Sequence, residues 1–182
     1  MNPVISDPEV QALAAIAAIL APEYDIPNDP WAASPFGWIR LQKSRRVGKI
    51  GEQIVSGFLA ARDFDIARTG DSEADRLVNG HRAEIKFSTL WGTGVYKFQQ
   101  VRNQDYEFAI CLGVSPFDAH CWVLPKAVLL EHVIGKLGQH SGAGGQDTAW
   151  ISLKPGAPPE WMRPCGGRLR DAVAVLEKIA KR

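Results

Sequence analysis

The chain has 182 residues, which is long enough for one folded domain that buries about 70% of the surface exposed by its unfolded form. Hydrophobic residues make up 46% of the chain and charged residues 23%, so the composition excludes a mainly disordered protein. The formal net charge of +1 neither requires nor excludes binding to nucleic acid, because the carboxylates of an active site would offset a basic surface elsewhere.

The sequence predicts a cytoplasmic protein that has no membrane association. No apolar run approaches the roughly 20 residues that span a bilayer. The N-terminus carries Asp7 and Glu9 where a secretory signal has basic residues. Cys111, Cys121 and Cys165 are odd in number and form no CxxC pair, which predicts buried, reduced thiols and gives no support to a zinc site.

Residues 1–43 are predicted to form a helix followed by a proline-rich packing segment. Ser6-Asp7-Pro8-Glu9 has the features of a helix start. The alanine-rich residues 10–20 that follow have small side chains, which predicts packing and not catalysis. Prolines then interrupt regular structure, and three aromatic residues are expected to fold this segment back onto the body: Trp31, Phe36 and Trp38.

A second helix is predicted at residues 44–62, because its apolar residues fall on one side of a helical wheel. Glu52 lies at the margin of this apolar stripe, from which a carboxylate can reach inward under the helix. Arg45, Arg46 and Lys49 lie beyond Glu52 on the solvent side, in a basic run that also holds Arg40 and Lys43. Such a cluster is a candidate for contacts with DNA phosphates, although a merely solvated helix face is equally compatible with it.

The pattern then changes to strands, and Asn79-Gly80 is a strong signal for a two-residue hairpin turn. The order of elements predicts an α/β (α+β) fold with a mixed central β-sheet flanked by helices, in a single domain over residues 1–182. Its core is expected at residues 44–124, and residues 125–182 are expected to supply C-terminal helices and a loop. The expected strands are residues 64–69, 74–79, 81–88, 106–114, 119–124 and 149–153; the expected helices are residues 125–134 and 168–181; the glycine-rich loop is residues 135–146.

The hairpin places charged residues together. If Asn79-Gly80 is the turn, counting outward along both strands brings Asp75 opposite Glu84, and Lys86 shares the face of Glu84 because strand side chains alternate. Two opposed carboxylates repel each other, and a hard divalent cation such as Mg²⁺ removes that repulsion. A neighbouring lysine can hold an attacking water and stabilise charge on a phosphoryl oxygen.

These residues resemble the PD-(D/E)xK nuclease superfamily, and within it the type II restriction endonucleases. The resemblance covers residues 44–124 and rests on Asp75, on Glu84-Ile85-Lys86 after a short hairpin, and on the helix before them. It implies a restriction-endonuclease-like core in which Asp75 and Glu84 bind Mg²⁺ (or Mn²⁺), the Ile85 carbonyl joins them, and Lys86 is the catalytic lysine. It also implies products with 5′-phosphate and 3′-hydroxyl ends.

Three further points bear on this resemblance. Glu52 matches the first-helix acid of many members, whereas Ala74 stands where the family motif has proline. Asp71 and Glu73 are rivals for the aspartate position, and Asp75 is preferred because of the hairpin register. The alternative interpretation of the whole cluster is an ordinary cross-strand charge group on a surface hairpin.

Residues after the second hairpin strand are candidates for DNA contacts. Gln99, Gln100 and Arg102 fall where related nucleases often contact the site or the DNA backbone, although a polar surface explains them equally well. The segment from Trp91 to Tyr96 mixes aromatic residues with glycines, which suits either stacking on bases or a turn anchored in the core by Trp91. The latter interpretation is slightly favoured.

The sequence therefore predicts a Mg²⁺-dependent endonuclease that acts on double-stranded DNA, of the restriction type. A homodimer is expected, because cutting both strands usually needs two active sites. The alternatives are a repair, junction-resolving or nicking nuclease, a catalytically degenerate DNA-binding module, and a protein-interaction domain that binds no nucleic acid.

Overall fold

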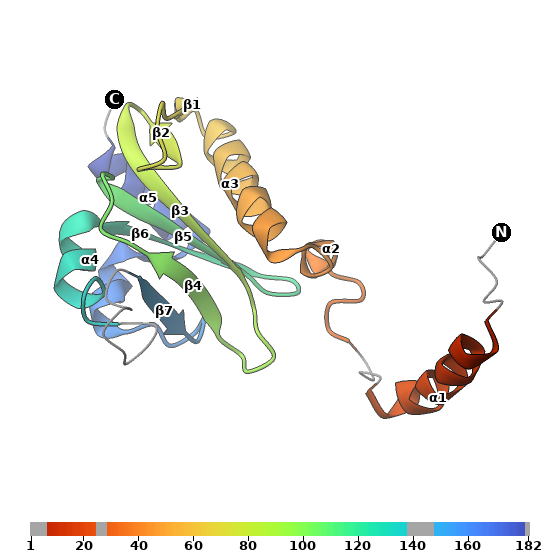
Figure 1. Cartoon of the computed structure of the whole chain (residues 1–182). Helices are drawn as coiled ribbons and strands as arrows, with labels where there is room; N and C mark the ends of the chain where they lie inside the picture. The colour runs from red at the N-terminus through yellow and green to blue at the C-terminus, as the bar shows by residue number, and fades with distance from the viewer. Residues whose placement is uncertain (1–6, 25–28, 138–147, 181–182) are drawn as a thin grey trace. The chain divides into compact units, whose positions relative to one another are not determined.

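A six-stranded mixed sheet forms the centre of the larger of the two units into which the protein divides (Figure 1). The computed structural model describes residues 7–24, 29–137 and 148–180. The smaller unit ends at Ala32 and the larger begins at Ala33. The smaller unit contains helix α1 (Pro8–Tyr24), and the packing role expected of its residues stays a prediction.

The strand order of the sheet is β1-β2-β3-β5-β6-β8. Only the β3–β5 pair is parallel within it, so the predicted mixed sheet flanked by helices is confirmed. Strands β4 and β7 form a separate antiparallel pair. The strands are β1 (Ile66–Arg68), β2 (Arg76–Val78), β3 (His81–Thr89), β4 (Tyr96–Val101), β5 (Phe108–Val114), β6 (Ala119–Pro125), β7 (Ala149–Leu153) and β8 (Gly166–Arg168).

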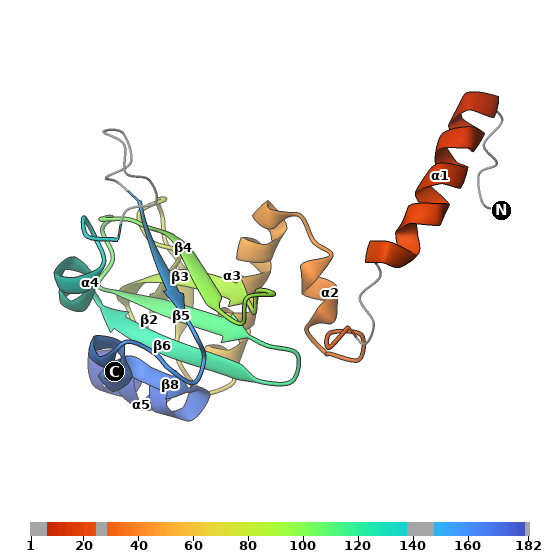
Figure 2. The same ribbon diagram turned by 90° about the horizontal axis from the view of Figure 1, so that it is seen from below.

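Each face of the sheet carries its own hydrophobic core, because β5 is buried along its whole length and its side chains alternate between the two. Helices α3 and α5 pack on one face, and β4, β7 and α4 on the other (Figures 1 and 2). The helices of this unit are α2 (Gly37–Arg40), α3 (Ser44–Ala60), α4 (Lys126–His132) and α5 (Leu169–Ile179), with a 3₁₀ helix η1 (Glu160–Cys165). In the described part of the chain no helix has the length and apolarity to cross a membrane.

Helix α3 turns its apolar stripe to the sheet, with Gly51, Val55 and Leu59 buried along one line. A β-carbon on Gly51 would lie 2.2 Å from the Phe87 β-carbon, so glycine is what lets the helix come this close to β3. The close approach fixes the start of α3, which carries the basic residues, beside the strand that carries the predicted active-site motif.

The predicted hairpin register is confirmed, since Val78 pairs with His81 and Arg76 pairs with Ala83. Asn79 and Gly80 both have positive φ, 49° and 85°, as a tight two-residue turn requires. Strand β2 begins at Arg76, however, so the alternation of faces does not extend to the residues before it. Ala74, which lies before β2, packs in the core on the face opposite α3.

Other expectations have mixed outcomes. Phe36 packs against the core as predicted, whereas Trp38 is half exposed. Cys111, Cys121 and Cys165 are free and buried. Strands β4 and β8 and the 3₁₀ helix were not predicted, and residues 138–147, which hold most of the predicted glycine-rich loop, lie outside the described residues, as does Ser6.

Candidate active site

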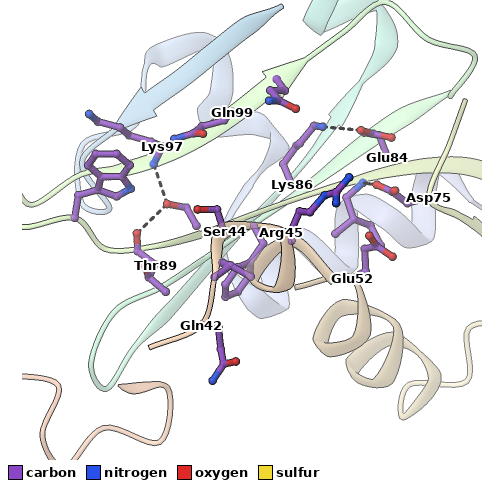
Figure 3. Close-up of a pocket in the computed structure, with 17 residues that line it drawn as sticks. Gln42, Ser44, Arg45, Glu52, Asp75, Glu84, Lys86, Thr89, Lys97 and Gln99 are labelled. Carbon is purple, nitrogen blue, oxygen red and sulfur yellow. Dashed lines mark hydrogen bonds and ion pairs between the residues drawn. The ribbon is translucent and has the colours of Figure 1, made fainter. Parts of the chain in front are cut away.

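A cavity of about 620 Å³ runs along the edge of β3, beyond the point where its pairing with β2 ends. The two sides of the cavity come from the start of α3 and from β4, and its floor comes from β3 (Figure 3). It contains Asp75, Glu84, Ile85 and Lys86 of the predicted motif together with Glu52. The structure thus brings the four predicted catalytic side chains to one cavity.

Asp75 lines the cavity, but the contacts that hold it there differ from the predicted pairing with Glu84. It precedes β2 and is not paired across the sheet with Glu84. Its backbone N–H donates to the Ala83 carbonyl at 3.0 Å, and its Oδ2 accepts the Ile85 N–H at 2.8 Å. The Asp75 carboxylate therefore accepts a backbone N–H at the edge of β3, where β2 no longer pairs with that strand. This hydrogen bond fixes the carboxylate beside Glu84.

Glu84 and Lys86 form a close ion pair, with 2.6 Å between Oε1 and Nζ. Their side chains are 9% and 15% exposed, so most of the water around both charges has been removed. Burial raises the pKa of Glu84, the nearby Lys86 ammonium lowers it, and the Asp75 carboxylate raises it again; the net direction is upward. Glu84 is thus a carboxylate whose negative charge the folded protein does not fully compensate.

Glu52 approaches from the other side of β3, and it is held by cations. Its Oε2 lies 3.1 Å from Nη2 of Arg76 and 3.3 Å from Nζ of Lys49. Arg76 also donates to Ser56 on α3 and to the carbonyl of Asp75. Glu52 is therefore tied to the segment that carries Asp75, and its carboxylate has two cationic partners already.

The rival acids for the aspartate position lie elsewhere. Asp71 pairs with Arg82 at 2.7 Å, and Glu73 accepts the N–H of Asp105 at 3.3 Å. Neither lines the cavity. The Asp71–Arg82 pair ties the loop before Asp75 to β3, and the Glu73 contact ties the same loop to the loop before β5.

The donor set fits a hard divalent cation, on two grounds. Asp75 and Glu84 supply adjacent carboxylate oxygens; burial raises the pKa of Glu84 and the Asp75 carboxylate raises it further, so a positive charge between the two carboxylates would offset their repulsion. The Ile85 carbonyl projects to the same strand edge as the Ile85 N–H that Asp75 accepts, because both groups of a strand residue point the same way. Within the described ranges, no group of three or more His, Cys, Asp or Glu residues could hold a metal ion, and the candidate ligands here are two carboxylates and one backbone carbonyl.

Among the predicted DNA contacts, Arg45, Gln99 and Gln100 line the cavity, whereas Arg46, Lys49 and Arg102 do not. Gln100 has a φ of +56°, and the β4–β7 register shifts between Phe98 and Val101. In a regular strand, neighbouring side chains point to opposite faces. The bulge explains how two consecutive glutamines reach one cavity.

Sequence reasoning missed several residues of the cavity. Ser88 shares the face of Glu84 and Lys86, so alternation along β3 predicts its position and was a usable signal. Lys97 carried no such signal, because its position depends on the pairing of β4 with the distant β7. The other missed polar residues that line the cavity are Gln42, Ser44 and Thr89.

Neither a scan against protein-family models nor a search of curated proteins gave a match. Among solved structures, the chain is similar to a bacterial homing endonuclease, I-Ssp6803I. The two are 17% identical with a TM-score of 0.48, and the match covers 77% of this chain and 97% of that chain. A likeness of this degree assigns no activity, so the roles of the residues in this chain rest on the geometry of the cavity.

Proposed function

We propose that the protein is a Mg²⁺-dependent endonuclease that hydrolyses phosphodiester bonds of DNA. The observation that supports this most directly is the buried Glu84 carboxylate, which lies beside Asp75 and pairs with Lys86 at 2.6 Å on the wall of an open cavity. A structural charge pair gains little from burial, because desolvation offsets the attraction of the charges. Perturbed, partly buried ionisable groups that share a cavity are typical of a functional site.

Each residue has a chemical task in this proposal. Asp75, Glu84 and the Ile85 carbonyl would hold the cation, which would supply positive charge to the phosphoryl oxygens. The Lys86 ammonium orients the attacking water and stabilises the oxygens of the transition state. Water attacks phosphorus in line, the bond to the 3′ oxygen breaks, and a proton passes to that oxygen, giving 5′-phosphate and 3′-hydroxyl ends. Glu52 acts as a positioning residue through Arg76.

The finer assignments follow from the same site. We propose a restriction-type enzyme that acts on double-stranded DNA in the cytoplasm and works as a homodimer, since one site cuts one strand at a time. Arg45, Gln99 and Gln100 line the cavity and contact the DNA near the cleaved bond. Arg46, Lys49 and Arg102 contact phosphates further away.

The experiment is a digest of supercoiled plasmid with Mg²⁺ or with EDTA. Lys86→Ala and Asp75→Ala are expected to lower the rate of cleavage by about 10²- to 10³-fold or more, because each removes a group that acts in the transition state. Lys178→Ala is the matched control, since Lys178 is an exposed lysine of α5 outside the cavity. Cleavage that persists undiminished in both cavity variants rejects the proposal.

The same digest separates the alternatives. Cut ends that share one short symmetric sequence support restriction, and ends that cluster at branches or nicks indicate a repair or junction-resolving enzyme. DNA binding that is unchanged by EDTA, together with no cleavage in Mg²⁺, indicates a degenerate DNA-binding module.

A further inference from the structure

Trp91 is an exposed aromatic residue that the proposed hydrolysis leaves without a role. It lies on the turn between β3 and β4, lines the cavity, and has 41% of its surface exposed. The turn is closed by hydrogen bonds from the Trp91 N–H to the Val95 carbonyl, at 2.9 Å, and from the Gly94 N–H to the Trp91 carbonyl, at 2.8 Å. A tight turn therefore presents an indole to solvent, and the expectation that Trp91 anchors the turn in the core is wrong.

The side chain of Lys97 lies against the Trp91 ring. Its Nζ lies 3.9 Å from the centroid of the Trp91 ring, so an ammonium lies over one face of the indole, and 41% of the Trp91 surface still remains exposed. The Lys97 backbone N–H donates to Oγ of the buried Ser88 at 2.9 Å, which fixes the start of β4 to β3 (Figure 3). The indole and the ammonium are thus held together on elements that are themselves fixed.

The position of this pair relative to the carboxylates suits a DNA strand. Trp91 follows Lys86 by five residues, so at about 3.3 Å per strand residue their Cα atoms are at most about 17 Å apart. Arg45 and Gln99 line the same cavity and leave it with cationic and amide groups along its sides. A nucleic-acid strand whose cleaved phosphate lies at Lys86 would run past the indole within a few nucleotides.

We propose that Trp91 and Lys97 form a nucleobase-binding site, in which the indole stacks on an unpaired DNA base near the cleaved bond and the Lys97 ammonium pairs with a neighbouring phosphate. The inference rests on the proposed hydrolysis of DNA phosphodiester bonds, and it favours the substrate of a repair enzyme over the fully paired DNA of a restriction enzyme. An aromatic ring stacks on any unstacked base, and a nearby cation adds attraction to the phosphate. A base inside a duplex is already stacked, so this site favours DNA with a gap, a mismatch or another unpaired base beside the cleaved bond.

The test measures DNA binding in EDTA, where hydrolysis does not interfere. The probes are a fluorescein-labelled duplex with a one-base gap and the fully paired duplex of the same sequence. Trp91→Ala is expected to weaken binding to the gapped DNA by about 5- to 150-fold, the range that loss of one base–aromatic stack produces. Binding to the paired duplex is expected to change by less than about 2-fold, and Trp91→Phe, which keeps an aromatic face, restores most of the affinity for the gapped DNA.

Phe117→Ala is the control, because Phe117 is another large exposed aromatic side chain and does not line the cavity. Thermal unfolding of every variant checks that the fold is kept. Trp91→Ala binding the gapped DNA as tightly as the native chain overturns the inference, and so does a native chain that binds both probes equally or binds neither. Failure of the hydrolysis itself is seen separately, as a lack of Mg²⁺-dependent plasmid cleavage by a chain that still shows the Trp91-dependent preference.

Discussion

The two faces of strand β3 have opposite roles, since one packs in a hydrophobic core and the other carries charged side chains. On the α3 face, Ala83, Ile85 and Phe87 pack against an amphipathic helix, and Gly51 lets that helix lie directly on the strand. On the other face, Glu84 and Lys86 bring charge into the protein. One strand with a period of two thus alternates between residues that hold the fold together and residues that cost stability in return for chemistry.

The short partner strand makes this arrangement possible. Strand β2 pairs with β3 only as far as Ala83, so the rest of β3 keeps an open edge on that side. Asp75 satisfies the Ile85 N–H at this edge with a side chain in place of a backbone carbonyl. The strand is therefore anchored on its apolar face and accessible at its edge, where the polar side chains can meet a substrate.

The largest expected effect lies on the apolar face. Ile85→Ala should lower the free energy of unfolding by about 2–5 kcal/mol, because it leaves a cavity between the sheet and α3. Urea denaturation measures this, with Ile85→Val as the graded control at about 0.5–1.5 kcal/mol. The backbone N–H that Asp75 accepts is kept, so the folded fraction should still cleave DNA. A loss of cleavage by fully folded Ile85→Ala would show that the two faces are not separable.

Substitutions on the polar face should have the opposite effect on the free energy of unfolding. The double variant Glu84→Gln, Lys86→Met replaces a buried ion pair with neutral side chains of similar size. We expect its free energy of unfolding to equal that of the native chain or to exceed it by about 1–4 kcal/mol, while cleavage is abolished. Single Lys86→Met should be the less stable variant, because it leaves the Glu84 carboxylate without its cation. A double variant less stable than Lys86→Met would contradict the view that this pair is kept for chemistry.

The two faces also differ in how well the sequence predicts them. The hairpin register followed from Asn79-Gly80, because few residues other than these accept positive φ at both turn positions. That register also fixes which side chains of β3 share a face, so Glu84 and Lys86 were placed correctly together. The register could be predicted because the turn that sets it depends only on neighbouring residues in the sequence.

What the sequence did not predict depends on contacts between distant segments. Asp75 was assigned by extending a register beyond the end of β2, and its true partner is the Ile85 N–H. Gln100 reaches the cavity through a bulge that exists only because β4 pairs with β7, some fifty residues later. Trp91 was expected in the core, because an exposed indole carries no sequence signal that separates it from a buried one.

A smaller effect is expected where α3 touches β3. Gly51→Ala should lower the free energy of unfolding by about 1–3 kcal/mol, because the new β-carbon overlaps Phe87 and outweighs the helical preference for alanine. Gly57→Ala, on the same helix, is the matched control. Apart from its chain neighbours and the adjacent backbone of α3, no atom lies within 4 Å of its β-carbon position, so it should raise stability by about 0.5–1 kcal/mol. Equal effects of the two substitutions in thermal unfolding would mean that α3 is not held against the strand at Gly51.

The smallest effect is a pH dependence of the metal-free chain. Burial raises the pKa of Glu84 above its ordinary value of 4.5, so the folded chain holds this proton more tightly than the unfolded chain does. The resulting contribution to stability is complete below pH 4.5 and is lost as the pH rises through the raised pKa of the folded state. Thermal unfolding in EDTA across the acid to neutral range should therefore show a decline that Glu84→Gln lacks, after subtraction of the titrations that both chains share. Parallel curves for the two chains would mean that the Lys86 ammonium compensates Glu84 fully, and the polar face of β3 would then carry no unbalanced charge for a cation to neutralise.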